Sequence, residues 1–211
     1  MKAITIDQIE DIFADRRPGA VGKYKFFSVL VPLVEKDGEI HLLYEVRADD
    51  LRRQPGEVCF PGGEVEGSET AQQCALRETV EELSITYADI RVINRIDTVY
   101  TYSNFTMYCY LGVIDYNAYE KCKPNLEEVK NIFLVPLKWL LDHEPYIYYM
   151  DIIPKIGKDF PYNLVNFNIG YNWRKGKSEV PIYRFEENVI WGLTGRITHN
   201  LVKILRSKMD E

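Results

Sequence analysis

A proline–glycine–glycine turn followed by a helix dense in carboxylates constrains this 211-residue chain more than any other feature. Proline fixes φ and glycine admits backbone conformations closed to other residues, so residues 61–63 are predicted to form a sharp turn. Residues 57–60 before it are predicted to form a short strand. Residues 69–83 after it are predicted to form a helix with Ser68 as its N-cap.

The charged residues of the predicted helix gather on one face. Because an α-helix turns by about 100° per residue, Glu78, Glu81 and Glu82 point the same way. Arg77 lies one turn before Glu81. Three carboxylates this close repel one another, and a bound cation relieves the repulsion; an all-oxygen ligand set suits Mg²⁺ or Mn²⁺. The alternative interpretation is a solvated acidic helix face, the usual meaning of a charge run.

The spacing of these residues favours the metal site. Gly63, Glu69 and the R-E-x-x-E-E run that starts at Arg77 follow the order G-x5-E-x7-R-E-U-x-E-E-x-G-U, with U a bulky aliphatic residue. This pattern resembles the Nudix box. Two positions depart from it, because Thr79 replaces an aliphatic residue and Ser84 replaces a glycine. Glycine relieves left-handed strain at a helix C-terminus, so Ser84 leaves the geometry of the following loop open.

The resemblance implies a role for each charged residue of the box. Glu78, Glu81 and Glu82 would be metal ligands, and Glu81 and Glu82 are also predicted to be catalytic. Arg77 would be a further catalytic-site residue that orients a box glutamate, most directly Glu81. Glu69 would fasten the loop to the helix rather than contact substrate.

Outside the box glutamates, three further residues are predicted to serve the diphosphate. The backbone of Gly62 and Gly63 can approach a phosphate because no side chain intervenes. The general base stays open between a box glutamate and Glu128, which precedes a predicted strand. A solvated surface acid is the alternative interpretation of Glu128.

The order of predicted elements indicates one α/β domain over residues 1–211, a mixed sheet with helices on both faces. The α/β/α sandwich is also the fold that the Nudix resemblance implies. Pro32, inside the first long strand, predicts an edge or bulge position. Residues 145–180 lack clean periodicity and are interpreted as an insertion that folds over the core, as a lid or a dimer contact. The remaining strands are expected at residues 24–34, 39–46, 90–99, 105–114, 129–135 and 180–185, and further helices at 5–16, from 137 and at 190–208.

The stretch before the turn resembles the signature of one Nudix branch, the coenzyme A pyrophosphatases, L-L-T-x-R-[SA]-x3-R-x3-G-x3-F-P-G-G. Arg47, Arg52 and Gly56 stand at the required spacing. Tyr44 and Glu45 depart from the Leu–Thr pair of that signature.

The two arginines of this stretch are predicted to bind substrate. Coenzyme A carries a 3′-phosphate besides its diphosphate, and arginine pairs with phosphate oxygens in bidentate fashion. Arg47 and Arg52 lie just before the turn and suit that role. The alternative is that they form salt bridges with the local acids Glu45, Asp49 and Asp50, since surface ion pairs are common and weak.

Two later stretches, residues 125–137 and 190–197, are similar to segments of the same branch. The resemblance therefore implies hydrolysis of the diphosphate of coenzyme A, or of a derivative, to 3′,5′-ADP and 4′-phosphopantetheine. Two alternatives stay open. One is a Nudix hydrolase of ADP-ribose, NADH or a dinucleoside polyphosphate, and the other is a non-catalytic Nudix module that senses nucleotides.

Composition limits the binding partners and the cellular compartment that we expect for the protein. A formal net charge of −6 argues against a general nucleic-acid-binding or membrane-surface-binding protein, because such proteins need a basic surface. The four cysteines are widely spaced, so neither a zinc site nor a disulfide framework is expected. An acidic N-terminal segment does not fit a signal peptide, and no apolar run is long enough to cross a bilayer. We expect a cytoplasmic protein, with a homodimer as a possible assembly.

Overall fold

The protein is described by a computed structural model that covers residues 4–167 and 170–209. Eight strands form one mixed sheet: β1 (Lys25–Lys36), β2 (Glu39–Arg47), β3 (Val58–Cys59), β4 (Gly62–Glu64), β5 (Ile90–Arg95), β6 (Val99–Tyr100), β7 (Phe105–Ile114) and β8 (Val129–Pro136). A second sheet contains β9 (Tyr146–Ile152), β10 (Gly176–Phe185) and β11 (Asn188–Ile190). The helices are α1 (Ile6–Ala14), α2 (Ala71–Leu83), α3 (Tyr116–Lys121), α4 (Leu137–Asp142) and α5 (Gly192–Met209), with short 3₁₀ turns at Tyr87–Asp89 and Tyr162–Val165.

Strand β1 lies in the middle of the main sheet. Hydrogen-bonded neighbours follow the order β3-β2-β1-β7-β5, while β4, β6 and β8 pair with β1, β7 and β2. β1 and β7 run parallel, and the other pairs of this sheet are antiparallel. The sheet is therefore mixed, as predicted.

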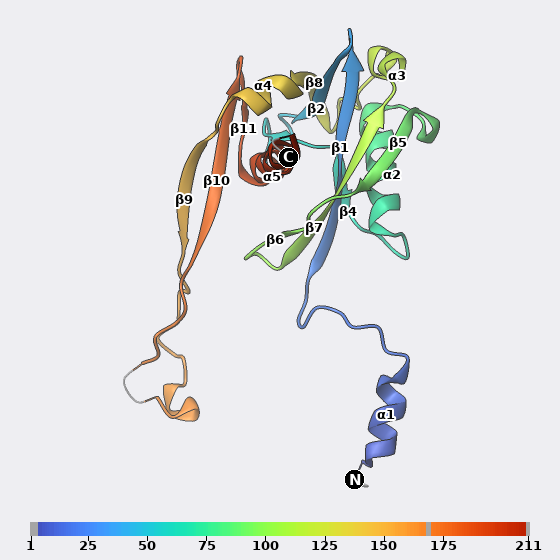
Figure 1. Cartoon of the computed structure of the whole chain (residues 1–211). Helices are drawn as coiled ribbons and strands as arrows, with labels where there is room; N and C mark the ends of the chain where they lie inside the picture. Colours follow the sequence, from blue (N-terminus) through green and yellow to red (C-terminus); the bar gives the residue numbers. More distant parts are fainter. Residues whose placement is uncertain (1–3, 168–169, 210–211) are drawn as a thin grey trace.

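Helices cover both faces of the main sheet (Figure 1). Side chains alternate between the two faces along a strand, and β1 contributes to both cores. Leu30 packs in one core with Ala75 and Leu83 of α2. Val31 packs in the other core with Ile197 of α5. This arrangement confirms the predicted α/β/α sandwich.

Pro32 lies inside this central strand, so the predicted edge position is wrong. On one side β1 pairs with β7 through Pro32 itself, opposite Gly112. On the other side the N–H of Leu30 donates to the carbonyl oxygen of Pro61 at 2.9 Å, and pairing with β2 begins only at Leu33. Alternate N–H groups of a strand point the same way. The N–H that proline lacks would therefore face the gap between β4 and β2, where no ladder bond is lost.

The helix that carries the predicted acids has a different N-cap from the expected one. Its N-cap is Thr70 rather than Ser68, because the Thr70 hydroxyl accepts the N–H of Gln73 at 3.2 Å. The Gln73 side chain accepts the N–H of Thr70 at 2.8 Å, which completes a capping box. At the other end, Ser84 has φ 53° and ψ 44°. This is the left-handed conformation that glycine adopts without strain.

The segment predicted to be an insertion forms much of a long hairpin. β9 pairs with β10 in antiparallel register from Tyr146↔Ile182 to Ile152↔Gly176. Figure 1 shows this hairpin on the α5 side, with its tip extending away from the main sheet. None of the β9 residues is buried, so no core face imposes an alternating pattern on the sequence. Its role as a lid or a dimer contact stays a prediction.

Hydrogen bonds join helix α5 to β2 and β3, the strands that precede the turn. The Thr194 hydroxyl donates to the carbonyl oxygen of Val58 at 3.0 Å. The hydroxyls of Tyr44 and Thr198 are 3.0 Å apart and both buried, so they share a hydrogen bond. These contacts hold β2 and β3 against the C-terminal helix.

Helix α1 contributes nothing to either core. Its apolar side chains, among them Ile6, Ile12 and Phe13, are exposed. Throughout the part of the chain that the structure describes, we find no helix with the length and apolar character needed to span a membrane.

We predict that Ser84→Gly stabilises the protein. A non-glycine residue in the left-handed region costs about 1–2 kcal/mol, and the greater freedom of glycine in the unfolded chain offsets part of the gain. The free energy of unfolding from urea titration should therefore rise by about 0.5–1 kcal/mol. Ser68→Gly is the control, since Ser68 has no positive φ to relieve. A lower free energy of unfolding for the Ser84 variant would contradict the strain.

Candidate active site

Arg77 lies at the centre of the acidic cluster on α2. Its Nε and Nη2 donate to the two carboxylate oxygens of Glu69 at 3.1 and 2.9 Å, a bidentate pair. Its Nη1 donates to Glu78 at 2.8 Å and to Glu81 at 3.2 Å. The hydrogen bonds to Arg77 lower the pKa of Glu69 to about 2. Glu69 also accepts the N–H of Glu66 at 2.8 Å, which ties the loop to the helix.

The glycine turn meets the acidic face of α2 directly. The N–H of Gly62 donates to Glu82 Oε2 at 2.9 Å. Any side chain at Gly62 would collide with the backbone of β1 at Val29. A Cβ at Gly63 would overlap the carboxylate of Glu78. Gly62 therefore lets the turn pack closely against β1, and Gly63 lets it pack closely against the Glu78 side chain of α2.

The three predicted metal ligands differ in how deeply they are buried. Glu82 is only 6% exposed, and its burial raises its pKa to about 8 despite the hydrogen bond from Gly62. Burial also raises the pKa of Glu78, and the positive charge of Arg77 acts in the opposite direction. The Glu81 side chain is 55% exposed. The cluster thus contains a buried carboxyl group that favours its proton and an exposed one at its rim.

The donor set fits a hard divalent cation, although the ligands are not gathered around one point. Among the described residues, no three His, Cys, Asp or Glu side chains lie close enough to hold a metal ion as they stand. Arg77 binds oxygens of Glu78 and Glu81, and Gly62 binds one of Glu82. The carboxylate oxygens that these hydrogen bonds do not use would be the metal ligands. Because residue 63 is glycine, no side chain covers the Glu78 carboxylate on that side.

The two predicted substrate-binding arginines lie in different surroundings. Arg47 is half-buried at the end of β2, and its Nε has no hydrogen-bond partner. Arg52 is exposed in the loop after β2. Within the described residues neither arginine forms a salt bridge, and Asp49 pairs instead with Lys130 at 2.7 Å. The structure therefore pairs neither guanidinium group with a carboxylate, although the charge of Arg47 acts on Glu45 and Glu82.

Glu128 lies on the rim of the same site. Its side chain is exposed, and its negative charge raises the pKa of both Glu78 and Glu82. Its backbone carbonyl oxygen accepts the N–H of Ala48 at 2.9 Å, which joins the loop after β2 to the loop before β8. The structure thus brings Glu128 near the box acids, although the box spacing does not include it.

Glu45 was not predicted to belong to the site. It is 1% exposed, its Oε1 has no hydrogen-bond partner, and its other oxygen lies 4.0 Å from Cys59 Sγ. Burial and the charge of Glu82 raise its pKa well above the usual range. The signal in the sequence is a single acid inside the apolar run of β2 (residues 42–46), at a position where the branch signature has threonine.

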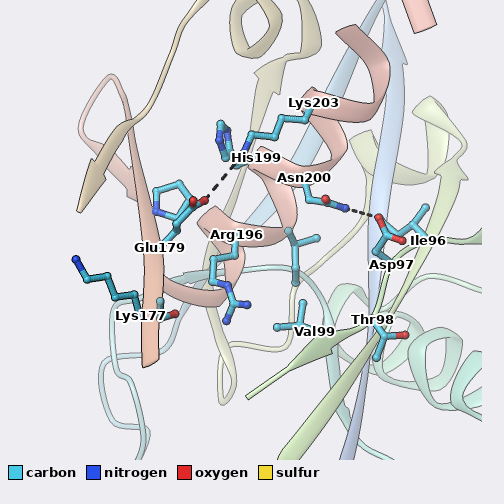
Figure 2. A pocket seen from close by; sticks show the side chains of 13 residues that line it. Ile96, Asp97, Thr98, Val99, Lys177, Glu179, Arg196, His199, Asn200 and Lys203 are labelled. Atoms are coloured by element: carbon cyan, nitrogen blue, oxygen red, sulfur yellow. Dashed lines mark hydrogen bonds and ion pairs between the residues drawn. The ribbon is translucent and has the colours of Figure 1, made fainter. Parts of the chain in front are cut away.

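A separate cavity lies on the α5 side of the sheet (Figure 2). Its volume is about 470 Å³, and its walls come from residues 96–99, 177–181 and 196–203. Asn200 donates to Asp97 at 2.7 Å across the cavity, and Lys203 lies 4.0 Å from Glu179. None of the site residues predicted from the sequence lines it.

The sequence matches the model of the NUDIX domain over residues 25–151, which is more than half of the chain. The peroxisomal coenzyme A diphosphatase NUDT7 of Mus musculus is 40% identical over 138 residues, which cover 64% of this chain and 56% of that protein. The matched region therefore spans little more than half the length of that relative. The mitochondrial coenzyme A diphosphatase NUDT8 of Mus musculus is 31% identical over 182 residues, 84% of this chain and 77% of that protein.

Solved structures are similar at lower identity. A binary complex of the Ap4A hydrolase of C. elegans is 20% identical, with a TM-score of 0.47, over 56% of this chain and 84% of that one. The family model covers the eight strands of the main sheet, the turn and the acidic helix described above. The chain belongs to the Nudix family.

Proposed function

We propose that this protein is a metal-dependent hydrolase that cleaves the diphosphate of coenzyme A, or of a derivative, to 3′,5′-ADP and 4′-phosphopantetheine. The observation that carries the proposal is the contact between the glycine turn and the acidic face of α2, where Gly62 binds Glu82. The substrate class is supported by two relatives that are named coenzyme A diphosphatases. In the reaction a water oxygen forms a bond to one phosphorus, and the anhydride bond from that phosphorus to the bridging oxygen breaks.

Glu78, Glu81 and Glu82 would hold Mg²⁺ or Mn²⁺. When bound, the metal supplies charge neutralisation on the diphosphate and a lower pKa for the attacking water. Arg77 holds Glu78 and Glu81 in place before any ligand arrives. Such preorganisation reduces the rearrangement that binding requires.

The backbone and the two arginines would position the diphosphate and the 3′-phosphate. Gly62 and Gly63 let the substrate approach the acids closely, since neither position has room for a side chain. Arg47 and Arg52 form no salt bridge within the described part of the chain, and guanidinium groups donate in bidentate fashion to phosphate oxygens. We retain Glu128 as the candidate for a base outside the box, because its exposed carboxylate lies near Glu78 and Glu82.

We also propose that the protein acts in the cytoplasm, as a single domain and possible homodimer without nucleic-acid or membrane partners. The two relatives above are named peroxisomal and mitochondrial. Subcellular fractionation of the source cells with antibody detection tests the location. Recovery in an organelle fraction would contradict it.

A substrate panel tests the reaction. With Mg²⁺ or Mn²⁺, we predict that coenzyme A is hydrolysed faster than ADP-ribose, NADH and dinucleoside polyphosphates. Glu82→Gln and Glu81→Gln should each lower kcat by orders of magnitude, because each loses a metal ligand or a base. Product formation should be followed by chromatography with all variants at equal concentration.

Each alternative function has its own outcome in this panel. A higher rate with another nucleotide would replace coenzyme A as the substrate. Binding of nucleotides without turnover would favour a sensing module. Turnover that survives both substitutions would contradict the metal ligands assigned to α2. Glu39→Gln, an exposed acid on β2, serves as the control.

We predict that pH acts in opposite directions on stability and on metal affinity. The raised pKa of Glu82, about 8, means that the folded protein binds more protons than the unfolded chain from about pH 4.5 to 8. The contribution of Glu82 to the free energy of unfolding therefore falls as pH rises through this window. Metal ligands must be deprotonated, so Mn²⁺ affinity should rise over the same range. The lowered pKa of Glu69 adds stability above pH 4.5 that is lost as pH falls towards 2.

Urea unfolding and Mn²⁺ titration of the chelator-treated protein, each from pH 5 to 9, measure the two effects. Glu82→Gln should flatten the dependence of stability on pH between 5 and 8. If the slope is the same in this variant, another group carries the protons.

A further inference from the structure

Glu45 is a buried acid whose carboxyl group is only partly satisfied by the chain. It is 1% exposed, and its Oε1 has no hydrogen-bond partner. Its Oε2 has a single contact with a side chain, a weak one with Cys59 Sγ at 4.0 Å. An ionised carboxylate taken out of water is costly unless it is paired or binds a metal. Among the described residues no salt bridge to Glu45 exists, so its position in the core needs another explanation.

A strand pairing and a hydrogen bond link Glu45 to the predicted metal ligands through the segment from Cys59 to Gly62. In the sheet it lies directly opposite Cys59 of β3, three residues before Gly62. Gly62 donates to Glu82, so Glu45 and Glu82 approach the same short segment from two elements. Burial raises the pKa of Cys59, and the negative charges of Glu45 and Glu82 raise it further. The carboxylate of Glu45 therefore extends the acidic face of α2 onto the sheet.

Arg47, the neighbouring cation on β2, has a buried donor atom without a hydrogen-bond partner. Arg47 follows Glu45 by two residues, so both side chains leave the same face of the strand. The Nε of Arg47 is buried and has no hydrogen-bond partner. The two groups form no salt bridge with each other in the described part of the chain. One strand thus presents an unsatisfied acceptor and an unsatisfied donor side by side.

A complex of a divalent cation and a diphosphate would satisfy both groups at once. Carboxylate oxygens would serve as ligands of the cation, and the phosphate oxygens would accept hydrogen bonds from guanidinium groups. We propose that Glu45 is a further ligand of the divalent cation, and that it binds the cation together with Glu82. This inference rests on the proposed function, because it assumes that the acids of α2 bind metal.

The position is a departure from the branch signature, which has threonine where this chain has Glu45. A carboxylate in place of a hydroxyl adds one negative charge to the metal site. The expected consequence is tighter binding of the cation and a less stable metal-free protein. A purely structural acid would show neither effect.

Binding of Mn²⁺ to the chelator-treated full-length protein, followed by the electron paramagnetic resonance signal of free Mn²⁺, tests the inference without any substrate. Glu45→Gln and Glu45→Thr should each weaken Mn²⁺ binding by about 10-fold or more. Both variants should also raise the Tm of the metal-free protein, because they remove a buried carboxyl group whose Oε1 has no hydrogen-bond partner. The rise in Tm on adding Mn²⁺ should shrink in proportion to the lost affinity.

Glu39→Gln is the matched control, since it removes the same charge from an exposed position on the same strand. Unchanged Mn²⁺ affinity in both Glu45 variants would overturn the inference. So would a lower metal-free Tm with unchanged affinity, which is the result expected for a structural acid. Gln and Thr differ in size, so an effect that both Glu45 variants share does not come from altered packing in one of them.

Glu82→Gln separates failure of this inference from failure of the proposed function. If Glu82→Gln weakens Mn²⁺ binding and the Glu45 variants do not, the metal site on α2 stands and Glu45 is not a ligand. If neither residue affects Mn²⁺ binding, both the proposed metal site and this inference are wrong. If both residues affect it while no nucleotide is hydrolysed, Glu45 remains a ligand and the proposed reaction is wrong.

Discussion

The site depends on one guanidinium group that binds three carboxylates. Arg77 binds Glu69 from the loop and two acids of its own helix, Glu78 and Glu81. Without a positive charge at this point, like charges one turn apart would repel one another and destabilise the helix. The bidentate pair with Glu69 also fixes where the loop returns to α2. Arg77 therefore fixes the loop relative to the acids of α2, while the hydrogen bond from Gly62 to Glu82 joins the turn to the helix.

The fold and the box residues were predictable because both depend on local patterns. Apolar runs indicate the strands, and helical spacing indicates α2. Successive side chains of β1 point to opposite faces of the sheet and so contribute to two cores. The cap of α2 was placed wrongly at Ser68, since Thr70 and Gln73 form a capping box that competes with it. Pro32 was misplaced for another reason: the backbone partner on one side of a strand can change along its length, and no local pattern records where it changes.

Glu45 and the hairpin of β9 and β10 could not be predicted in the same way. A carboxylate inside a strand carries no information about the helix that packs against it, and the distance from Glu45 to α2 along the chain is large. In β9, the absence of buried residues removes the alternation from which strands are recognised. The partner of β9 is also more than twenty residues away along the chain. Both features require knowledge of tertiary contacts.

The fastening of α5 has a consequence for folding kinetics. The Tyr44–Thr198 hydrogen bond joins residues 154 apart in the sequence, and the bond from Thr194 to Val58 joins residues 136 apart. Contacts of such long range slow folding, because the loop must close before they form. During synthesis the strands β2 and β3 emerge long before α5 does. The support beneath the glycine turn is therefore completed only after the chain up to Thr198 has left the ribosome.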